Sequence, residues 1–297
     1  MITLKTAKSQ LQIIPSLGGT LANLQLFNGK ESISILDSYE SADDANAKAG
    51  YKSHFLLPFP NRMKDGKYTF EGEKYQFPVN DTNTNNNLHG FLETLPMEIT
   101  KKEEKENRAT INLKGTFEGL PYYPFPFSFF VTYNLTDSQL TIQIKIKNRG
   151  NTKMPIGFGW HPYFKLGTQK VNDLKMQFPD CQIVKSDERM MPTGKTSAYT
   201  TFSKLETIGN TNLDNCFKLN HSDSKKVRIR LKSETVTLNV WQQTDMFPYF
   251  QIYTPDHRQS IAIEPMTCNV DAFNNENGLW ILDEKEERKI EFGVEMI

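Results

Sequence analysis

The sequence predicts an all-β protein, a single large β-sandwich spanning residues 1–297. Two observations support this fold class. Apolar and polar residues alternate along many short segments, which is the pattern of half-buried antiparallel strands. Residues that tolerate positive φ separate these segments, and helical periodicity is scarce. Many short strands with few helices favour two sheets packed face to face.

The strands are predicted from period-two alternation and from aromatic and β-branched residues, which strands prefer. Five segments carry these signals most clearly: residues 125–135, 141–146, 226–231, 235–240 and 289–295. A short helix is expected over residues 41–50 (SADDANAKAG), where Gly50 would end it. The sequence does not give the order of the strands in their sheets.

Turn signals lie between the predicted strands. An Asp-Gly pair at 65–66 and a Glu-Gly pair at 71–72 flank the segment KYTF, which suggests successive hairpins. Further turns are expected at 149–151 (RGN) and 276–278 (ENG). Residues 80–87 (NDTNTNNN) are rich in asparagine, and we expect a long ordered loop there instead of a domain boundary.

Composition narrows the class of protein. The 35 basic and 35 acidic residues give zero formal charge, so the basic surplus typical of a nucleic-acid binder is missing. No apolar run approaches the roughly 18 residues that span a bilayer, and the first residues do not resemble a secretory signal. The three cysteines follow no metal or disulfide spacing and are expected to be buried reduced thiols. We therefore expect a cytoplasmic protein with no nucleic-acid or membrane partner.

Three titratable residues stand out as candidates for chemistry. His161 lies among glycines, a proline and aromatic residues in GFGWHPYF, which suits a sugar pocket because sugar C–H faces pack on rings. Glu264 interrupts the apolar run SIAIEPM, and a buried carboxylate is unfavourable unless it serves a purpose. His89 ends the Asn-rich loop in NNLHG. The alternatives are a satisfied core histidine, a strand-end glutamate facing solvent and an ordinary loop histidine.

Other residues could bind a ligand. Arg62 follows the stiff segment PFPN, and its planar fork suits hydroxyls or a carboxylate. Asp214, in NLDNCF, could bind hydroxyls. For both residues a plain surface position is at least as probable from local sequence. No HExxH, CxxC, GxGxxG or GxSxG motif occurs, so zinc, nucleotide and serine-hydrolase sites are not indicated. His54, His221 and His257 lie among polar residues and are assigned no role.

Taken together, these motifs resemble those of the aldose 1-epimerase (galactose mutarotase) family. Five segments carry the resemblance, in the family's order: NR, NLHG, HPYF, LDNCF and IAIEP. It extends from about Pro58 to the C-terminus, and the chain is similar to the compact branch of the family. The resemblance implies a large antiparallel β-supersandwich, a small-molecule aldose as substrate, and a monomer or homodimer.

The resemblance also implies a role for each matching residue. It makes His161 the general acid, Glu264 the general base and His89 a ligand for the ring-oxygen side of the sugar. It gives Arg62 and Asp214 hydroxyl contacts. A looser match places a substrate-binding glutamine of the family at Gln251. One departure is Phe91, where the family often has glycine, and it is expected to add bulk near the pocket mouth.

Mutarotation suits these groups because it needs only proton transfers. A base removes the proton of the C1 hydroxyl, and an acid protonates the ring oxygen as the ring opens. Nothing is oxidised or transferred, so no cofactor or metal is expected. Three alternatives remain open from the sequence: a hexose-6-phosphate 1-epimerase, a glycosidase using Asp214 and Glu264 as paired carboxylates, and a non-catalytic sugar-binding protein on the same scaffold.

Overall fold

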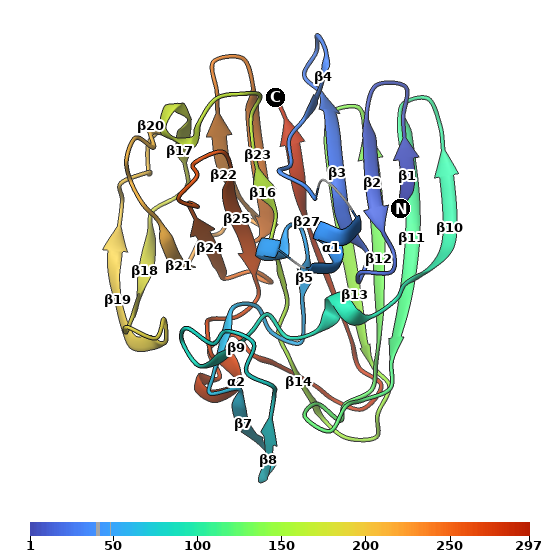
Figure 1. Cartoon of the computed structure of the whole chain (residues 1–297), viewed down its shortest axis with the longest axis vertical. Helices are drawn as coiled ribbons and strands as arrows, with labels where there is room; N and C mark the ends of the chain where they lie inside the picture. Colours follow the sequence, from blue (N-terminus) through green and yellow to red (C-terminus); the bar gives the residue numbers. More distant parts are fainter. Residues whose placement is uncertain (40–41, 48) are drawn as a thin grey trace.

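The alternating segment predicted at 141–146 lies next to the central strand of a nine-stranded antiparallel sheet (Figure 1). In the computed structural model, which describes residues 1–39, 42–47 and 49–297, strand β13 (Gln139–Asn148) buries Leu140, Ile142, Ile144 and Ile146. The residues between them face outward. Because side chains alternate across a strand, one face of the sheet enters the core and the other meets solvent.

The strands of this sheet come from both halves of the chain. In sheet order they are β10 (Glu98–Glu104), β11 (Arg108–Phe117), β12 (Phe127–Thr136), β13, β27 (Glu287–Met296), β23 (Thr237–Gln243), β22 (Lys226–Lys232), β17 (Lys175–Gln177) and β20 (Glu206–Thr207). The C-terminal strand β27 lies between β13 and β23, so it joins the two halves.

Two further sheets cover the apolar face. The eight-stranded sheet contains β19 (Pro192–Tyr199), β18 (Cys181–Ser186), β21 (Asp214–Leu219), β24 (Tyr249–Tyr253), β25 (Ile261–Met266), β15 (Gly159–Trp160) and β5 (Phe55–Leu56), with β16 (Tyr163–Phe164) also paired to β25. The four-stranded sheet contains β1 (Ile2–Lys5), β2 (Gln10–Ile14), β3 (Thr20–Phe27) and β4 (Ser32–Ser34).

Smaller elements complete the described chain. The two-stranded pairs are β14 (Met154–Ile156) with β26 (Trp280–Leu282), β6 (Arg62–Lys64) with β9 (Asn86–Leu88), and β7 (Lys67–Phe70) with β8 (Glu73–Gln76). The helical segments are α1 (Ala42–Ala47), α2 (Ala272–Asn275) and the 3-10 turns η1 (Ala49–Tyr51), η2 (Leu92–Thr94) and η3 (Val171–Asp173). The all-β prediction is therefore confirmed.

Aromatic side chains hold the sheets together. Phe292 of β27 packs against Trp160 of β15, with ring centroids 5.4 Å apart, and against Phe158 at 5.7 Å. Phe55 of β5 lies 6.0 Å from Phe129 of β12. Each of these contacts joins the nine-stranded sheet to the eight-stranded sheet or its connecting segment. Large buried rings supply much of the hydrophobic stabilisation of such an interface.

Several details differ from the sequence predictions. The turn at 65–66 forms, with Gly66 N donating to Met63 O at 3.1 Å, but only the second predicted hairpin, β7–β8, is a strand pair. Strand β6 pairs instead with β9, at the end of the Asn-rich segment, so residues 86 and 87 lie in a strand. A tight turn, in which Ser233 N donates to Val236 O at 2.8 Å, delays the strand predicted at 235–240 until Thr237.

The predicted helix at 41–50 corresponds to α1 followed by η1, with Gly50 at φ 69° where the helical path breaks. Ser41 and Lys48 lie outside the described residues. All three cysteines are buried and free, as expected. Among the residues that the structure describes, no helix is long and apolar enough to cross a membrane.

Candidate active site

The register of two central strands sets the floor of the site. Strand β25 places Glu264 directly opposite Gln251 of β24. Both side chains are almost fully buried, at 2% and 4% exposure. On the neighbouring strand β21, Asp214 is exposed and its Oδ1 accepts a hydrogen bond of 2.8 Å from Gln251 Nε2. The Gln251 amide is thus oriented with its carbonyl oxygen free for another donor.

His161 reaches Glu264 through a second register. Strands β15 and β16 flank His161, and both pair with β25, Gly159 with Met266 and Tyr163 with Ala262. Continuing this register between the two pairs places His161 opposite Glu264. The His161 Nε2 atom lies 3.4 Å from Glu264 Oε1. The structure thus brings together two predicted site residues that lie about one hundred residues apart in the sequence.

His89 is held beside the pair by Asn61. Both residues have left-handed backbones, at φ 69° and 61°, which is uncommon for residues other than glycine and concentrates at functional sites. Asn61 N donates to His89 Nδ1 at 3.1 Å, and His89 N donates to Asn61 O at 2.8 Å. Since Nδ1 accepts, the ring proton of neutral His89 lies on Nε2. The His89 ring stands edge-on to His161, with centroids 5.1 Å apart.

Arg62 extends from β6 into the same cavity. Its Nε donates to Asp81 Oδ2 at 2.9 Å, and its Nη1 lies 3.4 Å from Asn61 Oδ1. All six residues predicted for the site therefore line one hollow of about 320 Å³. The described residues that line it are Gly50, Tyr51, Asn61, Arg62, Leu88, His89, His161, Tyr163, Asp214, Gln251, Tyr253 and Glu264.

Sequence reasoning missed two tyrosines of this cavity. Tyr51, at φ 52°, packs edge-on against His89 at 4.7 Å. Tyr253 lies two residues beyond Gln251, so the same alternation that points Gln251 inward would have found it. Tyr163, noted in the sequence only as nearby aromatic surface, stacks on His161 with centroids 5.0 Å apart. Aromatic walls of this kind suit the C–H faces of a sugar.

Burial shifts the pKa values of the pair in opposite directions. It raises the pKa of Glu264 well above the ordinary glutamate value, and nearby Asp214 adds to this while Arg62 opposes it. It lowers the pKa of His161 to about 4. Attraction between a protonated His161 and an ionised Glu264 offsets part of the penalty of burying both charges. Both shifts favour the uncharged form of each group, in which Glu264 carries a proton and His161 does not.

The pocket presents polar atoms that no described side chain satisfies. His161 Nδ1, Gln251 Oε1 and Glu264 Oε2 are buried and make no hydrogen bond within the described part of the chain. Buried polar atoms are normally paired, and unpaired ones call for an explanation. All three atoms belong to residues that line this polar cavity. Among the described residues no cluster of three or more His, Cys, Asp or Glu is arranged to hold a metal.

Two residues lie where the sequence did not place them. Phe91 does not line the pocket; its ring stacks on Phe117 at 4.7 Å in the aromatic core. The left-handed backbone of Gly90, at φ 71°, turns the chain there, so the expectation of extra bulk at the pocket mouth was wrong. His54, which lies in a polar segment of the sequence, is fully buried beside the pocket, and its Nε2 lies 2.9 Å from Tyr39 Oη.

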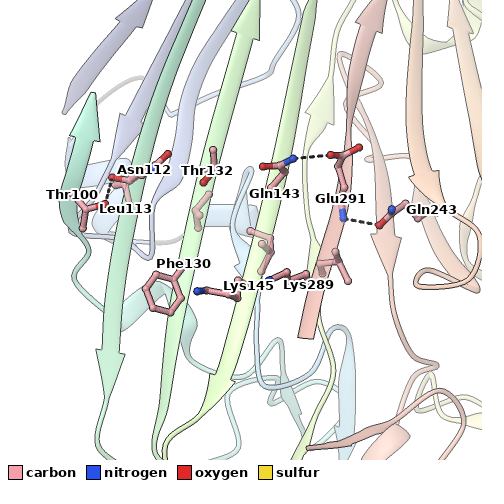
Figure 2. A pocket seen from close by; sticks show the side chains of 13 residues that line it. Thr100, Asn112, Leu113, Phe130, Thr132, Gln143, Lys145, Gln243, Lys289 and Glu291 are labelled. Carbon is pink, nitrogen blue, oxygen red and sulfur yellow. Dashed lines mark hydrogen bonds between the residues drawn. The ribbon is translucent and has the colours of Figure 1, made fainter. Parts of the chain in front are cut away.

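A larger hollow of about 470 Å³ lies on the outer face of the nine-stranded sheet (Figure 2). Its polar groups bind one another: Gln143 Nε2 donates to Glu291 Oε2 at 2.8 Å, and Glu291 N donates to Gln243 Oε1 at 2.8 Å. Lys145 covers the ring of Phe130 at 4.2 Å. The described residues that line it include no histidine, and their charged side chains are both basic and acidic. This face is a solvated sheet surface, and the six predicted site residues line the other cavity.

Solved structures with the same fold place this architecture in a known class. A galactose mutarotase-like protein from Clostridium acetobutylicum superposes with a TM-score of 0.87 at 20% identity, covering 99% of this chain and 94% of that one. Galactose 1-epimerase from Lactobacillus acidophilus NCFM gives a TM-score of 0.82 at 18% identity, covering 99% and 93%. These likenesses establish the predicted galactose mutarotase-like supersandwich.

Sequence comparison then identifies the family. The uncharacterized protein YihR of Escherichia coli (strain K12) is 27% identical over 245 residues, 80% of this chain and 77% of that protein. Galactose mutarotase of Mus musculus is 24% identical over 206 residues, 61% of this chain and 59% of that protein. The family model for aldose 1-epimerase matches residues 1–295. This chain belongs to the aldose 1-epimerase family.

Proposed function

We propose that this protein is an aldose 1-epimerase, an isomerase that interconverts the α and β anomers of an unphosphorylated hexose. The observation that carries the proposal is the His161–Glu264 pair, 3.4 Å apart and almost fully buried in a polar cavity lined by tyrosines. A histidine and a carboxylate at this distance can act on two neighbouring oxygens of one small substrate, here the C1 hydroxyl and the ring oxygen, which are both bonded to C1.

In the proposed reaction Glu264 is the base. Its carboxylate removes the proton of the C1 hydroxyl while His161, carrying the proton of the pair, protonates the ring oxygen and the C1–O5 bond breaks. Rotation about C1–C2 presents the other face of the aldehyde. The ring then closes with the proton transfers reversed, which restores both groups. Burial strengthens Glu264 as a base, because a raised pKa increases its affinity for the substrate proton.

The remaining residues bind and orient the sugar in this proposal. His89 donates from Nε2 towards the ring-oxygen side, since its Nδ1 is occupied by Asn61. Gln251 accepts from a hydroxyl through Oε1, because Asp214 holds its amide nitrogen. Asp214 and Arg62 bind further hydroxyls. Rigidly held groups of this kind reduce the entropic penalty of forming a reactive complex.

Charge supports a neutral aldose over a sugar phosphate. Among the described residues that line the cavity, Arg62 is the one that carries a permanent positive charge. Asp81 already neutralises this charge, with its Oδ2 atom 2.9 Å from Arg62 Nε. Glu264 and Asp214 add acidic groups to the same cavity. A phosphate dianion would find little compensation there. The pairing of Glu264 with His161, and of Asp214 with Gln251, also favours acid/base epimerisation over a glycosidase with two cooperating carboxylates.

The test is polarimetry of freshly dissolved α-glucose, α-galactose and glucose 6-phosphate with the wild type and two isosteric variants. We expect faster mutarotation of the neutral sugars than of the phosphate. His161→Asn and Glu264→Gln should each lower kcat by about 10²–10⁴-fold, the usual contribution of a positioned proton transfer. The control is His221→Asn, since His221 is exposed, and its rate should equal that of the wild type.

Near-normal rates in both pocket variants would contradict the assignment of His161 as the acid and Glu264 as the base. Faster turnover of glucose 6-phosphate would favour the phosphate epimerase. Tight sugar binding without any anomerisation would instead support a non-catalytic binding protein, and release of phenol from an aryl glycoside would support a glycosidase.

A further inference from the structure

We propose that Asp81, on the Asn-rich loop, is a positioning residue that holds the Arg62 guanidinium in the orientation that binds the sugar. This inference rests on the proposed function and adds a residue to it. Asp81 does not line the cavity, and the sequence motifs do not point to it. Its side chain reaches the cavity lining through a hydrogen bond with Arg62.

The contact itself is short and shielded. Arg62 Nε donates to Asp81 Oδ2 at 2.9 Å, and the two side chains are only 17% and 11% exposed. Pairs with this degree of burial are less screened than surface ion pairs, so they retain a defined geometry. Nε is bound by Asp81 and Nη1 faces Asn61, which leaves Nη2 without a hydrogen bond within the described residues. The guanidinium therefore presents the Nη2 group, as a hydrogen-bond donor, to a ligand oxygen.

Asp81 is itself fixed on two sides. Thr84 Oγ1 donates to the same Oδ2 atom that receives Arg62 Nε. The backbone N–H of Asp81 donates to Asn86 O, and Asn86 N donates back to Asp81 O, both at 3.1 Å. Asn86 begins β9, which pairs with β6, the strand that carries Arg62. Arg62 thus lies on β6, and Asp81 is bridged to the first residue of the partner strand β9, so the backbone sets their relative position.

Positioning through Arg62 predicts a specific kinetic signature. Arg62 binds hydroxyls that do not change during ring opening, so its contacts are equally strong in the ground state and in the transition state. Loss of such uniform binding raises KM and leaves kcat nearly unchanged. A general loss of structure would lower kcat or the amount of folded protein instead.

The test compares Asp81→Ala, Asp81→Asn and a matched control, Asp37→Asn. Asp37 pairs with Lys52 at the same 2.9 Å with similar exposure, but neither residue lines the cavity. We expect Asp81→Ala to raise KM for the preferred aldose about tenfold, the equivalent of one lost charge-assisted hydrogen bond, with kcat within about threefold. Asp81→Asn, which keeps an acceptor oxygen, should restore part of this loss, and Asp37→Asn should stay within about twofold of the wild type.

A second readout does not depend on catalysis. In ¹H–¹⁵N NMR spectra the Arg62 Nε–H signal, assigned with Arg62→Lys, should exchange slowly with water in the wild type and quickly in Asp81→Ala. Unchanged KM in Asp81→Ala, or equal exchange of Arg62 Nε–H in the two proteins, would overturn the inference. An inactive wild type that nevertheless shows the protected Nε–H would contradict the proposed function and leave this contact standing.

Discussion

At the scale of single residues, the proposed mechanism depends on two buried titratable groups that lie 3.4 Å apart. His161 and Glu264 are each unfavourable as isolated charges, because burial opposes the ionised form of both. The proposed mechanism uses the one-proton state of the pair in which the proton lies on His161. Moving the proton from Glu264 to His161 creates two buried opposite charges, and their attraction across 3.4 Å offsets part of the desolvation penalty.

This arrangement predicts an unusually broad pH profile for kcat. The pair gains a second proton, and loses its base, only below about pH 4, because the pKa of His161 is lowered to that value. It loses its last titratable proton only at a pH well above the ordinary glutamate value, because the pKa of Glu264 is raised. Activity should therefore stay high between these limits and fall on both sides.

The profile is measured by stopped-flow polarimetry after subtraction of the spontaneous reaction at each pH. Half-maximal activity near pH 6.5, the ordinary histidine value, would contradict the prediction, since it would mean that His161 titrates independently of Glu264.

At the scale of elements, the turn at Gly90 positions both His89, which precedes it, and the segment that leads into η2. Gly90 has φ 71°, and a Cβ added there would overlap the Leu57 carbonyl oxygen. That oxygen accepts hydrogen bonds from Phe91 N at 2.9 Å and Leu92 N at 3.2 Å, so it cannot easily move. The close approach lets β9 and η2 pack against the segment before Arg62 while Phe91 turns into the core.

We expect Gly90→Ala to destabilise the protein by about 3 kcal/mol or more and to reduce sugar affinity, because strain and overlap add at this position. Gly72→Ala is the matched control: its φ is 86°, but an added Cβ would meet no atom within 4 Å. It should lose only about 1–2 kcal/mol from the left-handed backbone. Urea unfolding measures both, and equal losses would show that the approach to Leu57 contributes nothing.

At the scale of the whole molecule, the interface between sheets depends on buried aromatic rings. Phe292 is fully buried and contacts rings from the facing sheet and from the loop after β23. Phe130, on the opposite face of the same sheet, is partly exposed and is covered by Lys145. The two residues therefore have the same side chain and lie in the same sheet, but one is buried between the sheets and the other faces solvent.

Phe292→Ala should lower the free energy of unfolding by about 3–5 kcal/mol, because it removes a large ring and leaves a cavity between the sheets. Phe130→Ala should lower it by about 1 kcal/mol or less, since solvent can fill the space. Chemical denaturation of both variants measures the difference. Similar losses would mean that the sheets do not depend on this contact.

The sequence by itself determined the fold class and singled out the candidate site residues. Period-two alternation predicts strands because side chains alternate across a pleated sheet, and this local rule needs no knowledge of partners. This rule was least successful where a strand pairs with one that is not its neighbour in the sequence. The turn at 65–66 suggested a hairpin of β6 with β7, whereas β6 pairs with β9. His161, Glu264, His89, Arg62, Asp214 and Gln251 were all found from motifs, and all line one cavity.

Only the tertiary structure decided how these residues meet. The register of β15 and β16 on β25 sets His161 against Glu264, and a shift of one residue would turn Glu264 to the other face. The pairing of β6 with β9 brings Asp81 to Arg62, which no local pattern indicates. Phe91 points into the core because of the turn at Gly90. The sequence specifies which side chains are present. Their distances, their burial and their pKa values arise only when strands that are remote in the sequence pair with one another.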